Sequence, residues 1–172
     1  MKRTDQNKKG LSGSVSAWDS ALRYLASSAR TKKEMERHLA EMGYGEEEIR
    51  TTMDRLEESG LLDDESYCME FVGSRLRSKP VSRLHLYEQL RLHGAEEGAI
   101  EHALNTVSKE IENENAVRIA RKYARQFSSL PDEMRTDRVY KRLLARGFDR
   151  DTIRIAIETV GSFSETECDD DE

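Results

Sequence analysis

Cysteine, proline and aromatic residues are all scarce in this chain of 172 residues. The only two cysteines, Cys68 and Cys168, lie far apart in the sequence, which excludes a disulfide framework and a metal site built on closely spaced cysteines. The chain has two prolines and 6% aromatic residues. Strand-rich folds need more valine, isoleucine and aromatic residues than this, so the composition favours helices.

Long apolar runs are also missing. No run approaches the roughly 18 residues that would span a bilayer, and residues 1–14 lack the apolar centre of a signal peptide. We therefore expect a soluble, cytoplasmic protein with no membrane contact. Apolar and charged residues each make up 36% of the chain, a balance typical of amphipathic helices with solvated outer faces.

Three glycines reveal an internal repeat. Aligning the chain on Gly43, Gly94 and Gly147 brings a leucine to the fourth position before each glycine, which indicates a helix that ends at that glycine. Apolar residues also recur after each glycine at helical spacing, and they predict the buried face of a second helix. These residues are Ile49, Met53 and Leu56 in the first unit, Ile100, Leu104 and Val107 in the second, and Ile153, Ile157 and Val160 in the third.

A further helix is predicted before each pair, so that each unit contains three helices. Its apolar stripes are Ala21, Leu22 and Leu25, then Tyr67, Phe71 and Val72, and finally Ile119, Tyr123 and Phe127. Thr31 with Glu34 forms a capping-box pattern, Ser82 is a second candidate cap, and Pro131 is a candidate helix start.

The predicted fold class is all-α, with three tandem three-helix repeats packed into an elongated, curved array. We expect neighbouring repeats to share apolar faces, because three small helices bury little surface alone. A compact nine-helix globule is the competing architecture. The predicted domains are a disordered tail over 1–15, repeats over 16–62, 63–108 and 109–161, and an acidic disordered tail over 162–172.

A search for catalytic chemistry identifies no candidate residues. The glycines follow helices instead of opening them, so they do not form a phosphate-binding loop. The four histidines are scattered, and no serine lies in a nucleophile-elbow pattern. Asp63, Asp64 and Glu65 could hold a cation, but acids in this position are more typical of the start of a helix. We therefore expect that the protein has no catalytic residue, no cofactor and no metal, and that it is not an enzyme.

Charge is segregated along the chain although its net value is only -6. Arg118, Arg121, Lys122 and Arg125 share one face of a predicted helix, and no acid occurs from Asn115 to Leu130. The next predicted helix adds Arg135, Arg138, Lys141, Arg142 and Arg146. A charged helix face is usually just solvated. Unopposed charge of one sign on neighbouring helices nevertheless indicates an anionic partner.

The chain resembles the RecX family of recombinase regulators over about residues 17–160. The resemblance is carried by LEESGLLDDESYCMEFVGSRLRSKP, residues 56–80, and by LLARGFDRDTIRIAI, residues 143–157. It implies a cytosolic protein that binds the RecA recombinase, within the groove of its filament on DNA, and mostly inhibits its recombinase and coprotease activities. The implied partner-binding residues are basic: Arg75, Arg77, Lys79, Arg83, Arg91, Arg118, Arg121, Lys122 and Arg125.

A tandem helix-turn-helix-like DNA-binding regulator is the alternative function. The last two helices of each unit superficially resemble that motif. However, the segments 43–48 and 94–98 are rich in glutamate, which would repel phosphates at the supposed recognition helix. Single-stranded or duplex DNA stays open as an additional partner, and we expect the protein to be a monomer.

Overall fold

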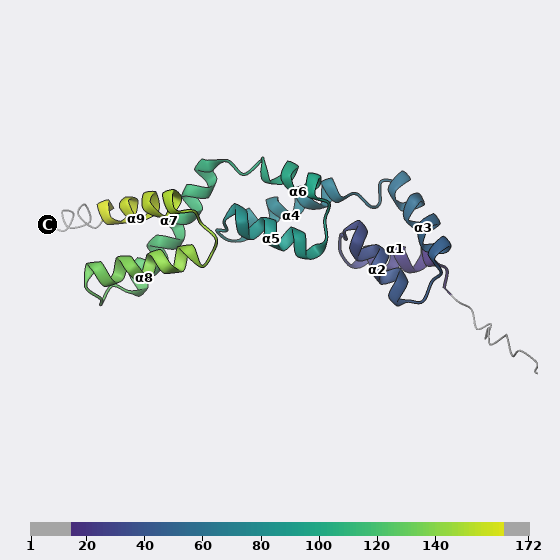
Figure 1. The fold of residues 1–172 in the computed structure, drawn as a ribbon, viewed down its shortest axis with the longest axis horizontal. Coiled ribbons are helices and arrows are strands. Elements are labelled where there is room, and N and C mark those ends of the chain that lie inside the picture. Colours follow the sequence, from purple (N-terminus) through teal and green to yellow (C-terminus); the bar gives the residue numbers. More distant parts are fainter. Residues whose placement is uncertain (1–14, 164–172) are drawn as a thin grey trace, which may run out of the picture.

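The computed structural model describes residues 15–163, and this range folds into nine α-helices without a β-strand. Three consecutive groups of three helices follow one another along a single elongated array (Figure 1). The first unit contains α1 (Ala17–Ser27), α2 (Lys32–Glu41) and α3 (Glu46–Glu58). The second contains α4 (Asp64–Ser78), α5 (Arg83–His93) and α6 (Glu97–Leu104). The third contains α7 (Lys109–Gln126), α8 (Asp132–Leu144) and α9 (Arg150–Phe163).

The helices begin where side chains satisfy the free N–H groups of the first turn. Thr31 and Glu34 form a complete capping box at α2. The Ser82 hydroxyl accepts a hydrogen bond from the backbone N–H of His85 in the first turn of α5 (3.1 Å). Asp63 caps α4 in the same way, so the acidic run at residues 63–65 marks a helix start, as expected.

The helices that precede the repeat glycines end as predicted. One helix that follows a repeat glycine ends earlier than predicted. Gly94 caps α5 in the left-handed conformation, at φ 75°, and Gly147 has φ 79° just after α8. In contrast, α6 ends at Leu104, so the prediction that Val107 belongs to the same helix is wrong. Val107 is nevertheless fully buried, because the loop before α7 turns it into the core of the second unit.

The apolar cores are separate, one in each unit. The buried residues of the first cluster all lie between Ala17 and Leu62, those of the second between Cys68 and Val107, and those of the third between Ala116 and Ala156. The expectation that neighbouring repeats share apolar faces is therefore wrong in the main. Only a few side chains, such as the half-buried Ile111 of α7, pack against the core of another unit.

The junction between the first two units is polar. The Thr31 hydroxyl donates a hydrogen bond to the backbone carbonyl of His93 (2.7 Å). The buried carboxylate of Asp64 accepts the backbone N–H groups of Lys32 (2.9 Å) and Glu96 (3.0 Å). A side chain at the start of one unit's second helix is thus tied to the glycine turn of the next unit.

The second junction repeats this geometry. The Ser82 hydroxyl donates to the backbone carbonyl of Arg146, the residue before Gly147 (2.6 Å). The buried carboxylate of Glu112 accepts the backbone N–H of Arg83 (3.0 Å). Because equivalent atoms are joined twice, the units follow one another with a repeated geometry, and the result is an elongated, curved array (Figure 1).

The expected limits of the domains stay a prediction. The last helix extends to Phe163, two residues beyond the expected end of the third repeat. The expected disordered tails otherwise fall on residues 1–14 and 164–172, which lie outside the described residues.

Candidate partner-binding surface

The basic stripe of α7 consists of Arg118, Arg121, Lys122 and Arg125, and all four residues are exposed. The buried residues of the same helix, Ala116, Ile119 and Ala120, face the core of the third unit. Within residues 15–163, no carboxylate lies within 4 Å of the charged groups of Arg118, Lys122 or Arg125. Three positive charges of the stripe therefore have no acidic neighbour in the part of the chain that the structure describes.

The other predicted contact residues lie in the second unit and do not behave alike. Arg77, Lys79 and Arg91 are exposed, and the guanidinium of Arg75 lies 4.8 Å from the centre of the Phe71 ring. Arg83 is half-buried, and its guanidinium donates a hydrogen bond to the backbone carbonyl of Val107 (3.1 Å). The side chain of Arg83 therefore holds the loop that leads into α7.

Three arginines that the resemblance did not include lie against aromatic rings. Tyr123 of α7 and Phe127, which caps the end of that helix, stack with ring centres 5.9 Å apart. Across from them, α8 presents Arg138 and Arg142, and Arg146 follows in the turn after α8, so that the three arginines recur at intervals of four residues. We call these five residues the arginine–aromatic cluster.

Each arginine of the cluster approaches a ring. The guanidinium carbon of Arg138 lies 5.7 Å from the centre of the Phe127 ring. The guanidinium carbons of Arg142 and Arg146 lie 5.7 and 5.0 Å from the centre of the Tyr123 ring. Arg146 also donates a hydrogen bond to the Tyr123 hydroxyl (2.5 Å). Ring faces carry negative partial charge and attract cations.

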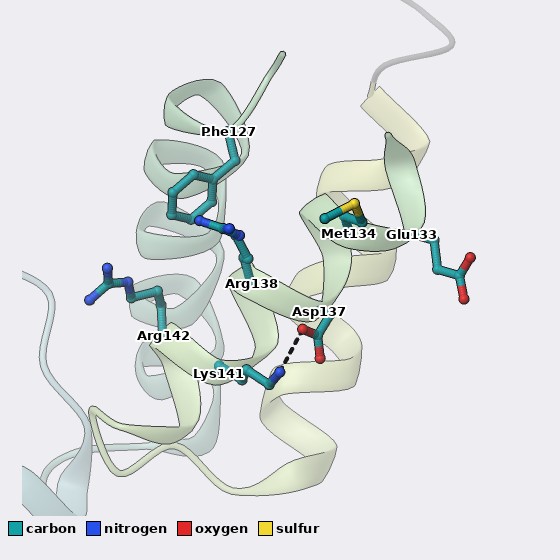
Figure 2. Close-up of a pocket in the computed structure, with 7 residues that line it drawn as sticks. All are labelled: Phe127, Glu133, Met134, Asp137, Arg138, Lys141 and Arg142. Atoms are coloured by element: carbon teal, nitrogen blue, oxygen red, sulfur yellow. Dashed lines mark hydrogen bonds and ion pairs between the residues drawn. The ribbon is translucent and has the colours of Figure 1, made fainter. Parts of the chain in front are cut away.

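These contacts position the arginines without neutralising them. Rings and hydroxyls carry no net charge, and no carboxylate among the described residues pairs with Arg138, Arg142 or Arg146. The neighbouring Lys141 differs, because it forms an ion pair with Asp137 (2.7 Å). Figure 2 shows Arg138 reaching toward Phe127 and the Lys141–Asp137 pair on another side of α8. The cluster thus gathers three net positive charges beside the two rings.

Two hollows accompany these cations. An open cavity of about 690 Å³ lies beside the cluster, and its lining residues are Phe127, Glu133, Met134, Asp137, Arg138, Lys141 and Arg142 (Figure 2). A second hollow of about 270 Å³, which we call the end groove, lies where α7, α8 and α9 meet. Its lining residues are Ala120, Arg121, Ala124, Arg125, Ser128, Arg135, Thr136, Val139, Ile157, Val160 and Gly161.

The end groove divides the basic stripe. Arg121 and Arg125 line it together with Arg135 of α8, whereas Arg118 and Lys122 lie outside its lining. Its floor is apolar, and Val139 and Ile157 contribute to it. An apolar floor with basic residues at the edge suits a ligand that carries both an apolar group and negative charge.

The side chains that could carry other chemistry are placed as core residues. Cys68 is fully buried, and burial raises the pKa of its thiol to about 11, so the nucleophilic thiolate is disfavoured. Burial likewise raises the pKa of Tyr67 to about 12. Among residues 15–163, no three His, Cys, Asp or Glu side chains are grouped to hold a metal ion. None of the helices in that range combines the length and the apolar character needed to cross a membrane.

Comparison with known proteins identifies the family. The profile described as RecX, first three-helix domain, matches residues 17–56, and the profile described as RecX, third three-helix domain, matches residues 110–157. A regulatory protein RecX from Chlorobaculum tepidum is 33% identical over 156 residues, which cover 91% of this chain and 92% of the relative. The chain belongs to the RecX family. A second RecX, from Chlorobium phaeobacteroides, is 31% identical over 144 residues, which cover 84% of this chain and 93% of that relative.

Solved structures of the family share the fold. The crystal structure of RecX from Lactobacillus salivarius has a TM-score of 0.80 at 24% identity, and the match covers 85% of this chain and 95% of that one. A second crystal structure, of a regulatory protein RecX, has a TM-score of 0.74 at 25% identity and covers 85% of this chain and 70% of that one. The three-helix array is thus an architecture that RecX proteins have in common.

Proposed function

We propose that this RecX protein binds the RecA recombinase filament on DNA and inhibits its recombinase and coprotease activities. The proposal rests on the family, whose members are named regulatory proteins, and on the unneutralised basic surface of the third unit. Phosphates and clustered carboxylates are the partners that such a surface attracts. The proposal includes a regulatory role without catalysis, a cytoplasmic location and a monomeric state.

We assign the partner contacts first to the third unit. The basic stripe lies on α7, and the arginine–aromatic cluster lies on α7, on α8 and in the residues just after these helices. The exposed cations Arg77, Lys79 and Arg91 of the second unit, with the half-buried Arg75, extend the proposed surface along the array. We keep Arg83 among the proposed contact residues because of its position, although its guanidinium is hydrogen-bonded to the backbone of the loop before α7.

The alternative, a helix-turn-helix-like DNA-binding regulator, receives less support from the fold. The recognition helices would be α3, α6 and α9. The first turn of α3 carries Glu46, Glu47 and Glu48, and α6 begins with Glu97 after Glu96. Acids at these positions repel phosphates, whereas the basic residues lie mainly on other helices.

The test compares two variants that lose the same charge. In R118Q/K122Q/R125Q, three cations without an acidic neighbour become neutral. In the control variant R23Q/R37Q/R50Q, three exposed cations of the first unit become neutral, and two of them form ion pairs. Both variants retain good helix formers at every changed position. Circular dichroism of both variants checks that the helices remain folded.

We expect the stripe variant to bind RecA filaments on single-stranded DNA about 10- to 100-fold more weakly, because exposed charge contacts contribute about 0.5–1 kcal/mol each. Inhibition of strand exchange should weaken in parallel, and the control variant should behave like the wild type. If phosphates are the partner, the log–log salt slope of binding should fall by about two units when three contacts are lost. Equal filament binding by the two variants would refute the assignment of this surface.

A further inference from the structure

The net negative charge of the chain arises from one short segment. Six of the 34 acids lie in residues 164–172, which contain no lysine or arginine. The rest of the chain therefore has as many acids as its 28 lysines and arginines, and this segment accounts for the whole net charge of -6. We call residues 164–172 the acidic segment. It lies outside the described residues.

The end groove is the basic hollow nearest in sequence to the acidic segment. Val160 and Gly161 of α9 line the groove, four and three residues before the segment begins. Arg125 of α7 supplies a positive charge without a carboxylate partner among the described residues, and Arg135 of α8, which forms an ion pair with Asp132 (2.8 Å), lies beside it. A chain spans at most about 3.3–3.6 Å per residue, so even the first few residues of the segment can reach these arginines.

Two physical effects favour this encounter over others. A short tether holds the segment at an effective concentration of about millimolar, which is high enough for weak contacts to form. The segment also follows the C-terminal end of α9, where the helix dipole repels acids. Arg125, which lines the groove, offers a positive charge that compensates for that repulsion.

The segment also has one residue that suits the apolar floor. Cys168 lies between Glu167 and Asp169, and a reduced cysteine behaves as a small hydrophobe. The order acid, small apolar residue, acid matches a groove whose floor contains Val139 and Ile157 and whose edge is basic.

We propose that residues 164–172 dock in the end groove of the same chain. The docked segment covers Arg121 and Arg125, two members of the basic stripe, and so competes with an anionic partner for them. This regulatory consequence rests on the proposed function, whereas the docking itself does not.

Cys168 provides a direct test in the full-length protein. A nitroxide label that reacts with thiols should modify Cys168 and spare Cys68, because Cys68 is fully buried and burial raises its pKa to about 11. The variant C168S should take up no label and checks this selectivity. The readout is paramagnetic broadening of methyl signals from the groove residues Val139 and Ile157, with Leu39 and Leu90 of the other units as references.

A spin-labelled variant that keeps Cys168 and lacks the six acids of the segment distinguishes docking from tethering alone. This acid-free variant is E165Q/E167Q/D169N/D170N/D171N/E172Q. We expect the broadening at the groove to fall severalfold in this variant, and also in the otherwise wild-type chain carrying R125Q/R135Q. Raising the salt to 1 M should have the same effect, because the Debye length shrinks to about 3 Å.

Equal broadening in the wild type and in the acid-free variant would overturn the proposal, since the tether alone would then explain it. A second sample mixes spin-labelled chains with isotope-labelled chains that carry no nitroxide. Broadening of the groove signals in this mixture would also overturn the proposal, because the segment would then bind a second molecule. Neither RecA nor DNA is present in this experiment. Its failure would therefore leave the proposed function standing, and failure of the filament assay would leave the docking standing.

Discussion

The polar junctions predict that equivalent glycines differ in their tolerance of substitution. Gly43 and Gly147 both have left-handed backbones, at φ 85° and 79°. An alanine in this conformation costs about 1–2 kcal/mol of stability at either site. A Cβ atom at Gly43 would have no neighbour within 4 Å. At Gly147 it would lie 3.0 Å from Ser82 Oγ and 3.2 Å from Leu84 Cβ, both of which belong to the preceding unit.

We therefore expect Gly43→Ala to lower the free energy of unfolding by about 1–2 kcal/mol, which is the cost of the left-handed backbone alone. Gly147→Ala should cost about 1–3 kcal/mol more, because forced overpacking displaces neighbours. The displaced Ser82 hydroxyl is the atom that joins the two units and that caps α5. The additional loss should therefore reach the second unit, although the substitution lies in the third.

The assay combines urea denaturation with native-state hydrogen exchange. Repeat arrays can unfold in parts, so a single unfolding midpoint does not assign the loss to a unit. Amide protection in α5 should fall in Gly147→Ala and remain unchanged in Gly43→Ala. Equal losses of stability in the two variants, with α5 protected in both, would show that the contact at Ser82 does not couple the units.

Three further predictions follow from named contacts. Leu90→Ala and Leu143→Ala should each cost about 2–5 kcal/mol in denaturant unfolding, because both side chains are 0% exposed and occupy equivalent core positions. Ser82→Ala should cost about 1–3 kcal/mol and lower amide protection at both the start of α5 and the second junction. The Lys109 ammonium and the Thr152 N–H lower the pKa of Asp149 to about 2. Its contribution to stability is thus present above the ordinary pKa near 4 and lost as the pH falls toward 2, and Asp149→Asn should abolish this part of the acid dependence.

Most of the helical architecture could be predicted from the sequence because its signals are local. The spacing of Leu39, Leu90 and Leu143 before their glycines depends only on the 3.6-residue period and on a left-handed cap. The capping box at Thr31 is equally local. Periodicity does not report where a short helix ends, so the spacing predicts Val107 in the same helix as Ile100, whereas Val107 is buried in the loop that follows α6.

The junctions and the arginine–aromatic cluster could not be predicted because they depend on how units and helices meet. The spacing of apolar residues identifies which residues are buried, but it does not show whether a neighbouring unit shares their core. The spacing of Arg138, Arg142 and Arg146 is visible in the sequence. Their approach to Tyr123 and Phe127 requires α8 to fold back along α7, which only the structure shows. A rule that pairs arginines and aromatic residues at four-residue intervals on consecutive helices would have found them.

The helix dipole is the strongest purely structural explanation for the charges of α7, and it covers only part of them. Apart from Lys109 at the first position, acids occupy the first half of the helix and bases the second half, which is the order that the dipole favours. The effect falls off within the last turn, however, and α7 ends at Gln126. Arg125 lies in that turn, but Arg118 lies about two turns from the end. Its exposed charge gains little from the dipole and has no carboxylate within 4 Å among the described residues. Comparing R118Q with R125Q therefore distinguishes the two explanations. If the charges stabilise the helix, R125Q should lower the melting temperature more than R118Q does. If they bind a partner, both variants should bind RecA filaments more weakly.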